Sequence, residues 1–163
     1  MSQLLIDRYA LGGELLTYAA QGLSPEQLTA RSGPGAWSIL ELVVHLADSD
    51  LVGADRMKRV IAEENPVLRA YDQDAWVKRL QYQEASLEDA ILLFVTNRRR
   101  MSSLLRTLAP EDFARSGEHT EKGRQTLAHL VTGYTHHLDY HLRFLYAKRS
   151  TLSVSLYPRY AED

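Results

Sequence analysis

Apolar residues recur at three- and four-residue steps along nearly the whole chain, while glycine and proline fall mostly between the periodic segments. This spacing places apolar side chains on one face of an α-helix, and such a face must be buried against another element. Four long segments carry the pattern, over residues 3–21, 38–64, 86–108 and 126–147. The sequence therefore predicts an all-α fold, a four-helix bundle.

Local signals mark where these helices begin and end. Ser38 and Glu41 form an S-x-x-E capping box directly before the second apolar run, in which each side chain bonds the other residue's backbone N–H. Asn65-Pro66 is expected to end this helix, and Pro110 is expected to end the third, because proline cannot continue a helix. The helix boundaries are thus predicted from capping residues as well as from periodicity.

Shorter segments lie between and after the long helices. Ser24-Pro25 combines an N-cap residue with proline at the first helical position, which predicts a short extra helix through about Arg31. The polar segment 116–123 is expected to be a loop, and residues 152–156 alternate apolar and polar side chains like a strand. Because one isolated strand is weak, we expect an extended C-terminal tail there, packed on the bundle or on a second subunit.

Composition sets modest bounds on function. The 163 residues, 45% of them hydrophobic, suffice for one domain over residues 1–163 with its own core. The 19 basic and 21 acidic residues nearly cancel, so neither a nucleic acid nor a membrane is expected as a partner. The short run Arg98-Arg99-Arg100 is predicted to be mostly solvated surface. Because cysteine, a secretion signal and a long apolar segment are all absent from the sequence, we expect a cytoplasmic protein.

Two of the six histidines lie four residues apart on the predicted last helix. His137 and His141 therefore project from one face, about a turn apart, a spacing that suits metal chelation. They share the apolar stripe of Tyr134, which is expected to be core, so the pair should look into the protein. An imidazole buried without a hydrogen bond costs about 1–3 kcal/mol, so hydrogen bonds or a metal must satisfy both. His129 and His136 fall on the opposite side and are expected to be solvated.

A third histidine, His45, lies near the flank of the apolar stripe of the second helix. Such a seam position can face a neighbouring helix, and bundle proteins assemble sites from side chains on facing helices. Together with His137 and His141 it could complete a three-nitrogen metal site. Glu41, one turn before His45, and Asp48, one turn after it, could orient the imidazole or accept a proton. The simpler explanations are the capping box for Glu41 and a solvated carboxylate for Asp48.

Two segments carry a resemblance to a known family. Residues 34–48 read PGAWSILELVVHLAD, and residues 136–141 read HHLDYH. Both resemble the signatures of the DinB/YfiT-like superfamily, and residues 71–76 and 119–127 are also similar to its members. The resemblance implies a four-helix bundle, often dimeric, that holds a divalent ion such as nickel, zinc, iron or manganese. The ligands that the resemblance implies are one histidine from the second long helix and two from the last: His45, His137 and His141.

Ligand counting favours a catalytic site. Three neutral histidines leave an ion with at least one open position, whereas structural zinc sites are usually closed by four protein ligands. Water or a small thiol could take that position and would lose its proton more easily there. The resemblance leaves both reactions open, because the superfamily contains transferases and isomerases that use a low-molecular-weight thiol and members described only as metal-dependent hydrolases.

A second function class stays open beside the enzyme. In it the protein is a non-catalytic bundle that binds a small molecule or a partner, and the histidine cluster or its ion is structural. Trp37 is expected to act as a packing staple at the start of the second long helix rather than as a substrate clamp. We predict a homodimeric metal-dependent enzyme with a small-molecule substrate, and we rank a DNA-related role last because the chain is close to neutral.

Overall fold

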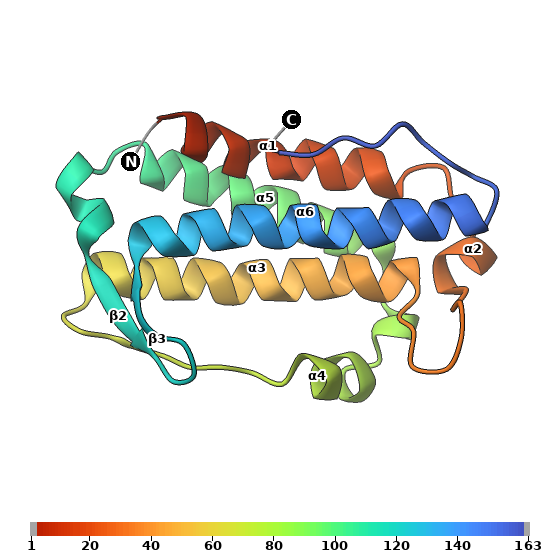
Figure 1. The fold of residues 1–163 in the computed structure, drawn as a ribbon, viewed down its shortest axis with the longest axis horizontal. Helices are drawn as coiled ribbons and strands as arrows, with labels where there is room; N and C mark the ends of the chain where they lie inside the picture. The colour runs from red at the N-terminus through yellow and green to blue at the C-terminus, as the bar shows by residue number, and fades with distance from the viewer. Residues whose placement is uncertain (1–2, 162–163) are drawn as a thin grey trace.

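Four long helices form the body of the protein in the computed structural model, which describes residues 3–161 (Figure 1). Their bounds are α1, Gln3–Ala20; α3, Ile39–Ala62; α5, Leu87–Leu105; and α6, Leu127–Thr151. The colours of Figure 1 show that α1 and α6 run in one direction and α3 and α5 in the other. None of the described helices is long and apolar enough to cross a membrane. The predicted four-helix bundle is confirmed.

Side-chain caps fix where three of these helices begin. Ser38 Oγ accepts the backbone N–H of Glu41 at 3.1 Å, and the Glu41 carboxylate accepts the N–H of Ser38 at 2.7 Å, which is the predicted capping box. Ser86 and Thr126 cap α5 and α6, each through its hydroxyl oxygen. Each cap satisfies one of the backbone N–H groups that a helix start leaves unpaired.

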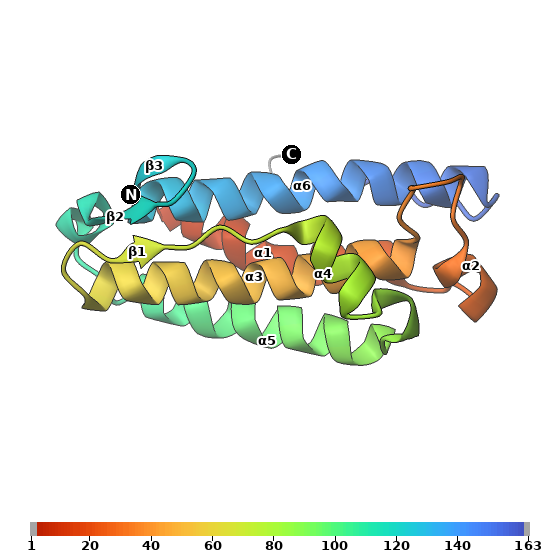
Figure 2. The same cartoon turned by 90° about the horizontal axis from the view of Figure 1, so that it is seen from below.

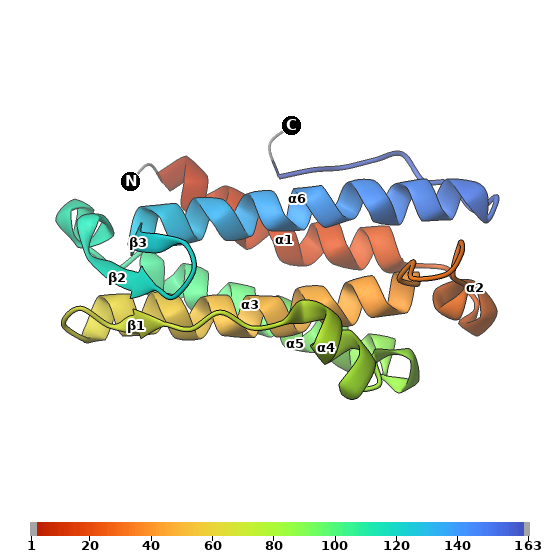
Figure 3. The same ribbon diagram turned by 60° about the horizontal axis from the view of Figure 1, so that its bottom comes forward.

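The helices do not follow sequence order around the bundle. α1 packs against α5 and α6, and α3 packs against the same two helices, so α1 and α3 lie on one diagonal. Since α3 and α5 run in the same direction, the chain between them must return along the bundle. It does so outside α3, through β1 (Val67–Leu68), α4 (Gln73–Arg79) and the 3₁₀ turn Tyr82–Glu84 (Figures 2 and 3). Helix α4 was not predicted from the sequence and is only seven residues long.

The segment expected to be a loop, residues 116–123, instead forms most of a β-hairpin. β2 (Ser116–His119) pairs antiparallel with β3 (Gly123–Thr126), and β1 joins β2 in parallel, with Leu68 opposite His119. Glycine, charged and amide residues dominate both strands of the hairpin. Their composition indicates a loop, and the second partner of β2 is β1, which lies far earlier in the chain.

The short helix and the extended tail are both confirmed. α2 spans Pro25–Thr29, and the chain after α6 is extended. The tail packs on the bundle itself, the first of the two predicted alternatives. Tyr18 on α1 donates a hydrogen bond to the carbonyl of Tyr157 at 3.1 Å, and the N–H of Ala161 donates to Asp139 on α6 at 2.9 Å. The tail therefore gives no support of its own to a homodimer, which stays a prediction.

A polar layer lies between two clusters of the hydrophobic core. One cluster lies toward the α2 end of the bundle and the other toward the hairpin. Between them Arg98 is buried, at 1% exposed, which corrects the prediction that the arginine run is surface. Arg99 and Arg100 are exposed. Consecutive helical residues point in different directions, and α5 turns the first of the three inward.

The Arg98 guanidinium joins all four long helices. Its Nε donates to Asp50 on α3 at 2.7 Å, its Nη1 to the carbonyl of Tyr9 on α1 at 3.0 Å, and its Nη2 to the carbonyl of Tyr134 on α6 at 2.8 Å. Gly12 makes room for it, because a Cβ there would lie 2.8 Å from Arg98 Nη1. A glycine inside a helix costs about 1 kcal/mol relative to alanine, and here the packing requires it.

Arg98→Met should destabilise the protein by about 3–5 kcal/mol, because it leaves the Asp50 carboxylate buried without its cation. Urea unfolding followed by circular dichroism measures the free energy of unfolding. Arg100→Met, in the exposed part of the same run, is the control and should change that free energy by less than about 0.5 kcal/mol. Equal effects of the two substitutions would show that Arg98 does not hold the bundle together.

Candidate metal centre

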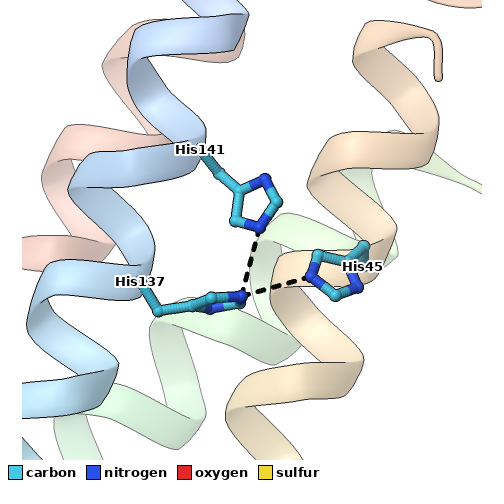
Figure 4. Close-up of side chains that lie close together, drawn as sticks. All are labelled: His45, His137 and His141. Carbon is cyan, nitrogen blue, oxygen red and sulfur yellow. Dashed lines mark hydrogen bonds between the residues drawn. The ribbon is translucent and has the colours of Figure 1, made fainter. Parts of the chain in front are cut away.

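Three histidine side chains converge in the seam between α3 and α6 (Figure 4). His45 comes from α3, and His137 and His141 come from successive turns of α6. The two α6 histidines lie on one face of the helix, as their four-residue spacing predicts. The Nε2 atom of His137 lies 3.3 Å from that of His45 and 3.1 Å from that of His141. One nitrogen from each ring lies within 4.8 Å of the other two, so the group could hold a metal ion.

Burial keeps all three imidazoles neutral at physiological pH. His45 and His141 are 1% and 8% exposed, and His137 is partly buried. Loss of hydration lowers the pKa of His137 to about 2, and it lowers the pKa values of His45 and His141 to about 4. Each ring therefore has an unprotonated nitrogen, which is the form of histidine that ligates metals.

The donor set fits a divalent transition metal. A tetrahedral ion about 2.0–2.1 Å from each nitrogen would hold the nitrogens about 3.3 Å apart, close to the 3.3 and 3.1 Å between His137 and its two neighbours. Imidazole nitrogens suit zinc, copper, iron or nickel better than calcium or magnesium. No carboxylate, hydroxyl or backbone group of the described chain bonds the three converging Nε2 atoms, whose polar contacts are with one another.

An aromatic side chain covers part of the cluster. The ring of Trp37 lies 4.9 Å from that of His45 and is stacked on His141, with 6.3 Å between the centroids. Tyr140 lies edge-on to His141 at 5.3 Å. Trp37 was predicted to have only a packing role, because it directly precedes the cap of α3. Nothing local in the sequence shows that α6 passes beside it.

The two carboxylates predicted to assist the site have other partners. Glu41 forms the capping box and an ion pair in which both of its oxygens accept from the Arg31 guanidinium. Asp48 accepts a hydrogen bond from the Tyr82 hydroxyl. In the described chain neither carboxylate bonds one of the three clustered histidines. A role for Glu41 or Asp48 at the site stays a prediction without geometric support.

A cavity of about 320 Å³ opens beside the cluster. Its wall combines side chains from α3, α6, the hairpin and the segment before α4, among them Arg56, Tyr71, His119, Tyr134 and His137. Because His137 belongs both to the cluster and to this wall, a small molecule in the cavity can reach His137. The other two histidines of α6, His129 and His136, are exposed as predicted. His129 nevertheless lines the same cavity as His137, which corrects the prediction that it faces the opposite side.

Comparison with known proteins places this architecture in a family. A family model of the DinB superfamily matches residues 9–145, which is most of the chain. The chain belongs to the DinB superfamily. The resemblance carried by the segments around His45 and His141 is thereby confirmed.

Two similar proteins bear the name "Putative metal-dependent hydrolase". OB0782 of Oceanobacillus iheyensis is 34% identical over 128 residues, which cover 78% of this chain and 74% of that protein. YfiT of Bacillus subtilis is 30% identical over 128 residues, which cover 78% and 72%. The solved structure of YfiT, described as having an unusual four-helix bundle topology, matches with a TM-score of 0.86 at 27% identity and covers 93% of this chain and 87% of that one. The arrangement of the four long helices in this chain is therefore similar to that in the YfiT structure.

Removing one ligand should abolish tight metal binding without unfolding the bundle. His137→Ala is expected to weaken the binding of Zn²⁺ or Ni²⁺ by more than about 100-fold, because it takes away one of three nitrogens. Competition with a chromophoric chelator measures the affinity, and the rise in melting temperature on adding metal should disappear as well. His136→Ala, at the exposed neighbouring position, is the control and should change neither quantity. Wild-type affinity in His137→Ala would contradict the assignment of the ligands.

Proposed function

We propose that this protein is a metal-dependent enzyme in which His45, His137 and His141 hold a divalent ion beside the substrate cavity. When bound, the ion would act as a Lewis acid that lowers the pKa of a water molecule or of a small thiol. The reaction is hydrolysis of a small molecule or transfer involving a low-molecular-weight thiol.

One observation carries the proposal: three neutral imidazole nitrogens converge at the edge of a cavity, and no carboxylate of the described chain joins the group. Structural zinc sites are usually closed by four protein ligands, whereas three protein ligands leave a position for a reacting molecule. The names of the two similar proteins, OB0782 and YfiT, support a metal-dependent reaction. Because the sequence has no cysteine, a thiol in this reaction must come from a cosubstrate.

Two of the three clustered histidines are covered by an aromatic side chain, and the third faces the cavity. Trp37 packs on His45 and His141, whereas the cavity wall contains His137. A reacting molecule therefore approaches from the cavity, whose volume of about 320 Å³ lies at the small end of ligand sites.

Metal-loaded protein should turn over a substrate from one of two panels, either esters and amides or electrophiles offered together with a small thiol. His45→Ala should abolish that rate while its circular dichroism spectrum stays that of the wild type, and His136→Ala should retain the rate. Treatment with a chelator should also abolish turnover, and adding the metal back should restore it.

Two outcomes would count against this function. A wild-type rate in His45→Ala would show that the cluster is not the reaction centre. No turnover in either panel, with stoichiometric metal bound, would favour the non-catalytic bundle with a structural ion.

A further inference from the structure

Arg56 on α3 is a buried cation at the wall of the cavity, and it is 9% exposed. Its Nη1 donates to the hydroxyl of Tyr134 at 2.9 Å and its Nη2 donates to the carbonyl of Arg69. Its Nε is buried and has no hydrogen-bond partner in the described chain, where no carboxylate forms an ion pair with it either. A guanidinium cannot lose its charge in a protein, so this buried cation needs a counterion.

Two other buried arginines show how this protein compensates such a charge. Arg98 pairs with the Asp50 carboxylate. Arg149, at 3% exposed, donates to three backbone carbonyls, two of them at the C-terminal end of α1, where the helix dipole is negative. Arg56 has only one carbonyl and one neutral hydroxyl as partners. It is also the only one of these three arginines that lines the cavity, so a ligand there can supply its counterion.

The hairpin brings a further donor and a further cation to the same cavity. His119 Nδ1 accepts the backbone N–H groups of Glu121 and Lys122, at 3.2 and 3.3 Å. The ring proton therefore lies on Nε2, which makes His119 a hydrogen-bond donor. Lys122 adds a positive charge to the wall and Glu121 a negative one, both on exposed side chains, so the charge of the buried Arg56 remains in excess. This balance of donors and charges favours a negatively charged ligand.

We infer that the cavity beside His137 binds the anionic group of the substrate or cosubstrate, a carboxylate or a phosphate, through Arg56 with Lys122 and His119. The inference rests on the proposed function for the reaction and names the class of molecule that the site takes, a small acid. A guanidinium can bond a carboxylate or phosphate with two parallel hydrogen bonds, which gives orientation as well as affinity. An anion held there leaves the rest of the molecule facing His137 in the shared wall.

Isothermal titration calorimetry tests this inference with succinate, inorganic phosphate and the neutral analogue succinamide. The metal is first removed with a chelator, and the chelator is removed by gel filtration, so binding is measured independently of the metal centre. We expect at least one of the two anions to bind and succinamide not to bind. The tighter anion identifies whether the site prefers a carboxylate or a phosphate. A failed metal centre would leave this result standing, and a failed anion site would leave the metal measurements standing.

Variants show whether the anion binds at the inferred place. Arg56→Gln should weaken anion binding by about tenfold or more, because a charge-assisted hydrogen bond is lost. Lys122→Gln should weaken it by a smaller factor. Arg115→Gln is the matched control, because Arg115 bonds the backbone carbonyls of Val60 and Glu63 outside the cavity.

Three results would overturn the inference: no binding of either anion, equally strong binding of succinamide, or unchanged anion binding in a folded Arg56→Gln variant. Circular dichroism establishes whether that variant folds. Should it not fold, Lys122→Gln takes its place, since it changes an exposed side chain, and unchanged anion binding in Lys122→Gln would then overturn the inference.

Discussion

The buried ion pair between Arg98 and Asp50 is the interaction on which the arrangement of the four long helices depends. A guanidinium removed from water must be compensated by charge and by hydrogen bonds, and here the partners come from α1, α3 and α6. The pair therefore fixes α3 against α6 at the carbonyl of Tyr134, about one turn before His137. The charge of Arg98 adds to the effect of burial in lowering the pKa of His137. The position of the candidate metal centre thus depends on a polar interaction inside the core.

Sequence analysis predicted the features that arise from neighbouring residues. The apolar period located the long helices, and Ser38 with Glu41 marked the start of α3. The four-residue spacing of His137 and His141 placed both rings on one face of α6, and the flank position of His45 directed its ring to the seam. These predictions succeed because periodicity and capping depend on a few positions of one helix.

Features that depend on contacts between distant segments could not be predicted in the same way. Arg98 was predicted to be one of three surface arginines, because nothing near it in the sequence shows that Asp50 on α3 packs against it. The hairpin has the composition of a loop, and β2 finds its partner β1 only in the folded chain. The roles of Trp37 and Arg56 also depend on distant segments. Trp37 contacts His141 on α6, and Arg56 bonds Tyr134 on α6 and the carbonyl of Arg69 in the segment after α3.

Elemental analysis of bound metal tests the candidate metal centre most directly. The protein is purified without added metal, equilibrated with equal amounts of nickel, zinc, iron(II) and manganese, and separated from free ions by gel filtration. Three converging neutral imidazoles predict a stoichiometric divalent ion in the wild-type protein and its loss in His45→Ala. Wild-type protein without bound metal, or the same metal content in His45→Ala, would contradict a metal centre formed by His45, His137 and His141.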